Sequence, residues 1–366
     1  MQPFASRPPQ PIPESWALTD EQRDLYAASQ RFARDRLVPL LSTPASDEVW
    51  QDTVRLAATL ELGTMILPAN FDGMAIDRHD LALVVGALAA GPLERATELT
   101  LSAPALMTMR AHDALDSLAV HDIQDYFDGT SSIAWTVPDS QSAALWRLRS
   151  KAVTRRQTLW SSTDGQKLAL IEQPNDAEPS HGKCVATLGA LCLERVDVDE
   201  VRATAPLMTL MTLEQRDQHG VCPVQTWLTE IGLYLCALSI GAMQHSVQFA
   251  LDYGTARQAF KKPLMAHQLV ATRLADMLIA THGSQLFLRS VACARAPLPA
   301  SLVRQLARHV AATSADVNRE LVQFCGGHGY VEGLAPAARF QTNHWFTWLL
   351  MRIDSALAPF TTSAQS

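Results

Sequence analysis

The C-terminal part of the chain carries a succession of long helical patterns, and this feature most constrains the fold. From about residue 223, apolar side chains recur at three- and four-residue spacing, at Trp227, Ile231, Leu235, Leu238 and Ala242. Further helical patterns cover about 269–291, 301–324 and 337–357, and prolines or glycines separate them. Because connected amphipathic helices bury their apolar stripes against one another, this part predicts a four-helix bundle.

The rest of the chain divides by composition. Prolines at positions 3, 8, 9, 11 and 13 predict a flexible arm, and helical patterns with proline breaks follow it. From about residue 131, short β-prone segments alternate with Asp, Ser, Gly and Pro, which indicates a small sheet or barrel. The predicted class is mainly α with a middle β-domain. The expected domains are an arm over 1–15, a helical domain over 16–130, a β-domain with linker over 131–220, and a four-helix domain over 221–366.

The composition is that of a soluble globular protein, with 48% hydrophobic and 18% charged residues. The net charge of -7 gives no general attraction to nucleic acid or anionic lipid. No secretory signal is visible, and the longest apolar run, about 231–243, is shorter than the roughly 20 residues that span a bilayer. We therefore expect a cytoplasmic protein without a nucleic-acid or membrane partner.

The six cysteines form no CxxC pair and no Cys/His set with zinc spacing. In a reducing compartment such cysteines are free thiols. The sequence therefore predicts neither a disulfide nor a bound metal.

The segment 253–268 combines residues that suit a cofactor with phosphate groups. Arg257 offers a planar donor pair for a pyrophosphate, Phe260 a flat apolar wall, and Gln268 an amide for a base or ribitol. The alternative is an arginine solvated near a helix C-terminus. On these residues alone, the solvated arginine is the favoured interpretation.

A second segment, 323–330, has three glycines within four residues, at Gly326, Gly327 and Gly329. Such a turn lets backbone N–H groups approach a ligand closely. The alternative is a helix C-cap followed by a tight turn.

Together the two segments resemble the acyl-CoA dehydrogenase family. Its members carry an R-x-x-F-G-x-P-(I/L) stretch, a glutamine and a later L-A-D-M, followed by Q-x-x-G-G-x-G-(Y/F). The spacing from Arg257 to Gln268 and from Gln323 to Gly327 matches, and Leu274-Ala-Asp276-Met277 is present. The stretches 18–22, 62–76 and 125–138 also resemble family segments, so the resemblance extends over the whole chain.

The resemblance implies the three-domain fold, with FAD bound between sheet and C-terminal helices and across a subunit interface. It implies that the adenine–pyrophosphate side of a neighbour's FAD is reached by Arg257, Phe260, Gln268, Gln323, Gly326 and Gly327. It also implies that Thr136 contacts the isoalloxazine ring. The implied reaction is α,β-dehydrogenation of an acyl-CoA thioester, with an electron-transfer flavoprotein as acceptor.

The family's catalytic base is not found at its usual positions. The family uses a glutamate after the glycine turn, but residues 345–351 contain no carboxylate. A second known position corresponds to about 231–238, which also lacks an acid. Glu230 lies one residue outside and is the candidate base, because burial on an apolar helix would raise its pKa. For the other acids considered, a solvated position is favoured: Asp252, Glu332 and Asp354.

Further departures leave three interpretations open. Lys261 replaces the glycine after the R-x-x-F, and Val137 replaces the glutamate before Pro138. The chain is the base-lacking subunit of a heteromer, such as a heterotetramer, in the first interpretation. In the second it forms a homo-oligomer that uses an unusual base or catalyses another reaction on an acyl group. The third possibility is a flavin-free scaffold that retains the fold. The heteromer is the preferred interpretation. The segments 253–268 and 323–330 argue against the scaffold, since without a cofactor nothing would require their residues.

A basic group lies at the entry to the β-domain and consists of Arg147, Arg149, Lys151, Arg155 and Arg156. It would attract the phosphates of coenzyme A if it faced a binding site. A solvated strand face is the favoured alternative.

Overall fold

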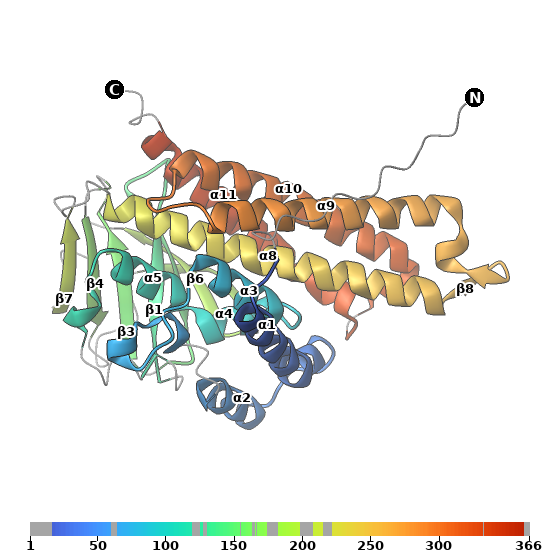
Figure 1. Ribbon diagram of the computed structural model, residues 1–366, viewed down its shortest axis with the longest axis horizontal. Coiled ribbons are helices and arrows are strands. Elements are labelled where there is room, and N and C mark those ends of the chain that lie inside the picture. Colours follow the sequence, from blue (N-terminus) through green and yellow to red (C-terminus); the bar gives the residue numbers. More distant parts are fainter. Residues whose placement is uncertain are drawn as a thin grey trace.

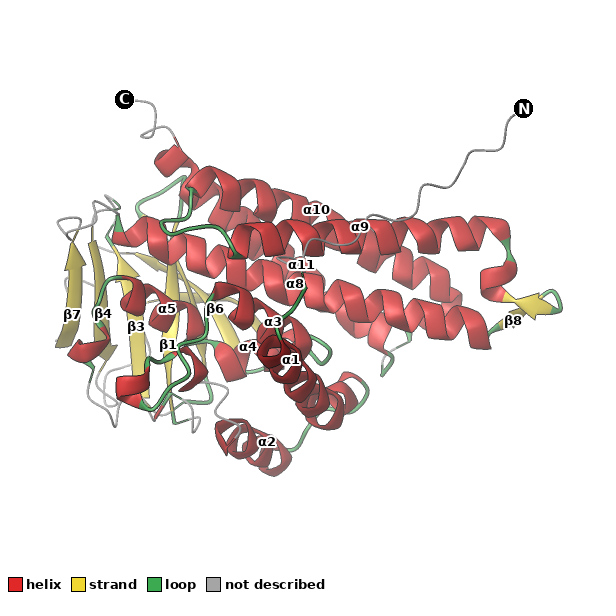
Figure 2. Ribbon diagram, in the orientation of Figure 1, coloured by secondary structure: helices red, strands yellow, loops and turns green. Residues whose placement is uncertain are grey.

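A computed structural model shows a helical N-terminal part, one sheet and a long C-terminal bundle (Figure 1). The structure describes residues 17–59, 64–118, 125–126, 130–153, 155–162, 165, 167–173, 182–197, 208–214, 222–331 and 333–361. The sheet lies at one end of the bundle, beside the first turns of α8, as the colouring by secondary structure shows (Figure 2). The expected fold class is confirmed, while the arm over 1–15 lies outside the described residues.

The N-terminal part contains five described α-helices, of which α1 and α3 begin at residues whose side chains accept from backbone N–H groups. They are α1 (Asp20–Phe32), α2 (Asp47–Thr59), α3 (Arg78–Leu88), α4 (Leu93–Thr100) and α5 (Ala103–Ala111). Thr19 Oγ1 accepts from the Gln22 N–H at 3.1 Å, and the Gln22 side chain accepts from the Thr19 N–H. This capping box satisfies two of the free donors at the start of α1. Short 3-10 turns connect several of these helices, at Val38–Leu41, Thr64–Ile66, Ala69–Phe71 and Leu115–Ser117.

The described strands form one seven-stranded sheet in the order β5-β6-β2-β1-β3-β4-β7. They are β1 (Ser131–Pro138), β2 (Ala144–Ser150), β3 (Arg155–Ser161), β4 (Lys167–Gln173), β5 (Gly182–Leu188), β6 (Leu191–Asp197) and β7 (Met208–Glu214). The β1–β3 pair is parallel and the other pairs are antiparallel. Strand β1 is buried over most of its length, because helices cover the sheet there.

The bundle contains α8 (Pro223–Ala256), α9 (Gln268–Ala292), α10 (Ala300–Cys325) and α11 (Ala335–Leu357). These bounds confirm the four helices expected from periodicity. Between α8 and α9 the chain forms a two-stranded hairpin, β8 (Gln258–Ala259) and β9 (Lys262–Pro263). The hairpin projects from the end of the bundle that lies farthest from the sheet (Figure 1).

Helix α8 is the central helix of the molecule, and side chains along it are buried against other helices and the sheet. Among the described helices it is the one long and apolar enough to cross a membrane, which the shorter run 231–243 did not suggest. Its most apolar 18-residue window is completely buried inside the protein. Core helices of globular proteins have this character, so α8 offers no apolar face to lipid.

A buried arginine ties α11 to α8 and to the turn that follows α3. The Arg339 guanidinium donates to the backbone oxygens of Ala242 at 2.9 Å and Ala90 at 2.7 Å. Burial lowers the pKa of Arg339 to about 10. Burial, together with the charge of Arg339, holds the pKa of His245 on α8 at about 4, well below the ordinary 6.5.

We expect acid to weaken the fold through His245. The unfolded histidine binds a proton below pH 6.5, whereas the folded one resists it down to about pH 4. The unfolded state therefore gains protons first, and stability is lost as pH falls through this window, by at most about 1.4 kcal/mol per pH unit. Denaturant midpoints measured from pH 7 to pH 4 check this. His245→Gln should lose less stability than wild type over this range, whereas the exposed His282→Gln should follow wild type.

Candidate functional site

The two segments that carry the family resemblance come together at the far end of the bundle. Arg257 ends α8, and Gln268 begins α9 after the hairpin. The Tyr253 hydroxyl donates to the backbone oxygen of Cys325 at 3.3 Å and lies 2.9 Å from Nδ1 of His328. This contact holds the end of α8 against the glycine turn that follows α10, although the two lie more than 70 residues apart in the sequence.

The side chains expected to bind a cofactor are exposed at this end. Arg257, Gln268 and Gln323 are exposed, and Phe260 is 92% exposed in a backbone conformation with φ of 50°. The Gln323 amide donates to the Tyr330 hydroxyl at 2.8 Å. The exposed ring of Phe260 offers a flat apolar surface on which a ligand or a neighbouring chain can pack.

The glycine turn is open on its outer side. A Cβ atom built on Gly326 or Gly327 would meet no other atom within 4 Å, and Gly326 has φ of 57°. A ligand can therefore approach the backbone of this turn closely. Together with Arg257, Phe260 and the two glutamines, the turn fits the phosphate and adenine end of a dinucleotide. We call these six residues, Arg257, Phe260, Gln268, Gln323, Gly326 and Gly327, the distal cluster.

Thr136, the residue expected at the flavin ring, lies at the opposite end of the molecule. It is completely buried in β1; its hydroxyl donates to Leu159 O at 2.7 Å and accepts from the Ser161 N–H at 3.1 Å. Its backbone oxygen accepts from the indole of Trp227 at 2.9 Å. The hydroxyl is thus engaged by the sheet itself, and its contact with a flavin stays a prediction.

The distance between the two ends decides how a cofactor can be bound. Trp227, which contacts Thr136, and Arg257 are thirty residues apart on one continuous helix. At 1.5 Å per residue this is about 45 Å, longer than a single dinucleotide. One FAD molecule cannot reach both Thr136 and the distal cluster of the same chain (Figure 1).

Glu230, the candidate base, is buried on α8 and paired with a cation. Arg78 Nε, at the start of α3, donates to Glu230 Oε1 at 2.6 Å. Burial raises the pKa of Glu230, while Arg78 and Arg110 act in the opposite direction. The carboxylate links the N-terminal helices to the bundle, and its role as a base stays a prediction.

The other acids differ in their surroundings. Asp354 is only 5% exposed and pairs with Arg304 and Arg308, each at 2.9 Å, so the expected surface position is wrong. The fold places α10 beside α11 there, which the local sequence around Arg352 did not reveal. Asp252 is exposed, as expected, and Glu332 lies outside the described residues.

Two members of the basic group at the β-domain are not solvated. Arg147 is buried and donates through Nε to Glu194 at 2.8 Å, and Arg149 also donates to Glu194 at 2.8 Å. The expectation of a solvated strand face is therefore wrong for these arginines. Strand pairing sets Arg147 opposite Glu194, and the ion pairs leave neither arginine available for coenzyme A.

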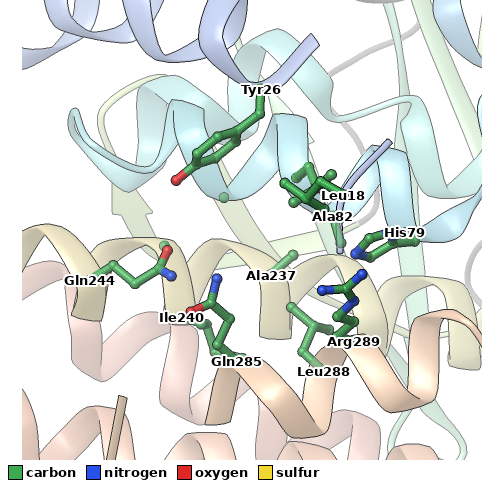
Figure 3. A pocket seen from close by; sticks show the side chains of 13 residues that line it. Leu18, Tyr26, His79, Ala82, Ala237, Ile240, Gln244, Gln285, Leu288 and Arg289 are labelled. Atoms are coloured by element: carbon green, nitrogen blue, oxygen red, sulfur yellow. The ribbon is translucent and has the colours of Figure 1, made fainter. Parts of the chain in front are cut away.

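A cavity of about 140 Å³ lies where α1, α3, α8 and α9 meet, away from both ends of the bundle (Figure 3). Its polar lining includes Tyr26, His79, Gln244, Gln285 and Arg289. No sequence pattern indicated this cavity, because its walls come from four separate segments. Among the described residues, no group of three or more His, Cys, Asp or Glu side chains is placed to hold a metal ion.

The sequence did not show which distant residues Arg78 and Trp227 contact. Each makes its decisive contact with a residue about 90 or more positions away, Trp227 with Thr136 and Arg78 with Glu230. The position of Glu230 on an apolar helix did indicate that this acid is buried, but not that a cation pairs with it.

Comparison with known proteins agrees with this fold. Residues 219–351 match the family described as "Acyl-CoA dehydrogenase, C-terminal domain". A 3-sulfinopropanoyl-CoA desulfinase of Paraburkholderia xenovorans is 23% identical over 345 residues, which cover 86% of this chain and 88% of the relative.

Solved structures share the architecture over nearly the whole chain. Butyryl-CoA dehydrogenase from Megasphaera elsdenii superposes with a TM-score of 0.73 at 16% identity, covering 95% of this chain and 99% of that one. A glutaryl-CoA dehydrogenase from Mycobacterium smegmatis, in complex with FADH2, gives 0.68 at 13% identity, covering 94% and 95%. Residues 219–351 thus match the C-terminal domain of the acyl-CoA dehydrogenase family, and the chain shares the fold of solved acyl-CoA dehydrogenases.

Proposed function

We propose that the chain is a subunit of an acyl-CoA dehydrogenase-type flavoprotein whose FAD is shared between subunits. In the proposed reaction, an acyl-CoA thioester loses an α-proton and a β-hydride, and the hydride passes to FAD. The observation that carries the proposal is the distal cluster, an open set of cofactor-type residues about 45 Å from the sheet of its own chain. Such a set is useful only to a cofactor held mainly by a neighbouring subunit.

Exposed apolar side chains support a neighbour at this surface. Leu269 is 81% exposed, Ile279 71% and Leu286 51%, all on α9. Several large exposed apolar side chains along one helix suit a surface that a partner covers. We propose a related dehydrogenase subunit as this partner, in a heteromer such as a heterotetramer.

In the heteromer, this chain needs no base of its own. Its Arg257 would pair with the pyrophosphate, Phe260 would pack on the adenine side, and the backbone of Gly326 and Gly327 would approach the phosphates. The flavin supplies the electron-accepting chemistry when bound. The partner's active site would then carry the carboxylate that removes the α-proton.

A homo-oligomer is the second candidate, and Glu230 is the observation that favours it. It is a buried carboxylate, its pKa is raised by burial, and it lies one residue from a position that the family uses. In that case Glu230 would remove the α-proton after Arg78 moves away. The desulfinase relative indicates that this fold also hosts other reactions of acyl-CoA thioesters. We further propose cytoplasmic location and an electron-transfer flavoprotein as acceptor.

The test is the FAD content and mass of the chain, purified alone and co-expressed with a related subunit, by flavin absorbance and light scattering. We expect little FAD alone and about one FAD per pair of unlike chains in the complex. One FAD per chain in a stable homo-oligomer would favour the second candidate. Colourless protein in both preparations would contradict both candidates and favour the scaffold.

Arg257→Met is expected to weaken FAD binding by the complex about tenfold or more, because a charge-assisted bond to phosphate is lost. Arg55→Met is the matched control, since Arg55 is an exposed arginine on α2 that pairs with Asp52 at 2.8 Å. Fluorescence titration with FAD measures both variants. Equal affinity of the two variants would exclude the distal cluster from the cofactor site.

A further inference from the structure

Two cysteines of the β-domain lie in direct contact. Cys184 is in β5 and Cys192 in β6, and their Sγ atoms are 3.1 Å apart. Formation of a disulfide needs the sulfurs to approach by about 1 Å more, to a bond of about 2.05 Å. Among the described residues, the other four cysteines make no such contact with a second sulfur atom. The closeness is therefore particular to this pair.

The strand pairing explains why the two sulfurs meet. Cys184 is paired with Glu194 and Cys192 with Thr187, so the cysteines are diagonal neighbours. The register shifts between Cys184 and Ala186, which leaves one extra residue in β5. A bulge increases local twist and re-aims side chains, and this brings Cys184 onto Cys192.

The two thiols differ in accessibility. Cys184 is exposed on β5, which is the edge strand of the described sheet, while Cys192 is completely buried. Burial, with the contact to Cys184 and the nearby Glu194, raises the pKa of Cys192 to about 12. An oxidant in solution therefore reacts with Cys184 first, while the buried Cys192 remains a protonated thiol.

We propose that Cys184 and Cys192 form a peroxide-sensitive dithiol, in which Cys184 is the reactive and Cys192 the resolving cysteine. The Cys184 thiolate attacks hydrogen peroxide; the S–O bond forms, the O–O bond breaks, and the hydroxide released takes a proton to become water. The Cys192 sulfur then attacks the Cys184 sulfur. The S–S bond forms, the S–O bond breaks, and the thiol proton of Cys192 leaves with the hydroxide as a second water.

A disulfide between Cys184 and Cys192 would link the edge strand β5 to β6, next to the buried ion pairs of Glu194. Glu194 accepts from both Arg147 and Arg149, and its Oε1 lies 3.8 Å from the Cys192 sulfur. The oxidised pair would therefore be held next to a rigid, fully paired group. Thiols of the cell would reverse the bond by exchange, since Cys184 is accessible.

The experiment uses the full chain. The protein is reduced, freed of reductant and treated with one equivalent of hydrogen peroxide, and it is then alkylated under denaturing conditions. Trypsin cuts after Lys183 and Arg195, so one peptide, 184–195, contains both cysteines. We expect this peptide to escape alkylation and to weigh about 2 Da less than its reduced form, with reversal by dithiothreitol. Alkylation of both cysteines, or sulfinic acid at Cys184 in the wild type, would overturn the proposal.

Three variants sharpen the result. Cys184→Ser, at an exposed position, should abolish the change. Cys192→Ser should let peroxide carry Cys184 on to sulfinic acid, because the resolving thiol is missing. Cys293→Ser removes another exposed cysteine and should oxidise like wild type. If Cys184→Ser still gives a protein with two thiols fewer after peroxide, another pair forms the bond.

Discussion

Gly241→Ala is expected to destabilise the protein by about 3 kcal/mol. This is more than the cost of adding one methyl group at a core position where neighbouring side chains can move aside. A Cβ atom on Gly241 would lie 2.2 Å from the backbone oxygen of Gly86 and 2.7 Å from its Cα. These are backbone atoms of α3, so α3 and α8 must move apart as whole helices. The gain in helix propensity from alanine, about 1 kcal/mol, does not offset this.

Two other helix glycines serve as controls. They distinguish the steric effect at the close α3–α8 crossing from the general effect of replacing glycine by alanine in a helix. Gly86 lies at the same crossing, but a Cβ atom there would meet only Ala237 O at 3.6 Å, an ordinary contact. Gly283, on α9, would meet nothing within 4 Å, so Gly283→Ala should stabilise the protein by about 0.5–1 kcal/mol. Thermal and denaturant midpoints of the three variants measure the order. Similar midpoints for Gly241→Ala and Gly86→Ala would contradict the crossing described here.

Arg78→Met is expected to cost about 3–5 kcal/mol, because it leaves the Glu230 carboxylate buried without its cation. The pair joins α3 to α8 at 2.6 Å, and Glu230 is 3% exposed. Glu230→Gln in the same background should restore much of the loss, since a neutral amide needs no counter-charge. Denaturation of both single variants and the double variant gives the coupling free energy, which we expect to exceed 1 kcal/mol.

An exposed pair provides the comparison for this cycle. Arg55 and Asp52 lie at 2.8 Å on the surface of α2, three residues apart, and such pairs contribute at most about 0.5 kcal/mol. Equal coupling in the two cycles would mean that Glu230 is well solvated, contrary to its burial.

The Glu230→Gln variant also separates the two candidate functions. If the chain is a self-sufficient enzyme, turnover should fall by several orders of magnitude while the fold remains, because a general base is lost. If the chain is the base-lacking subunit of a heteromer, the activity of the complex should change only as far as stability does. Activity and denaturant midpoint measured on the same preparation distinguish the outcomes.

The sequence by itself determined the local features of this protein. Apolar periodicity placed the helices of the bundle within two or three residues of their observed ends, because a helix is decided largely by its own side chains and caps. The resemblance also singled out the six residues of the distal cluster from two short segments with fixed spacing, and their role in binding a cofactor stays a prediction.

Only the tertiary structure decided which distant residues meet. Glu230 finds Arg78 across 152 positions, and Asp354 is buried between arginines of another helix rather than exposed. Arg147 is neutralised by Glu194 because β2 pairs with β6, and Cys184 meets Cys192 because of one bulge. The length of α8 also separates Thr136 from Arg257, so one dinucleotide cannot reach both halves of the expected cofactor site within one chain. Such contacts depend on how helices cross and strands pair, and these depend on side chains far away along the chain.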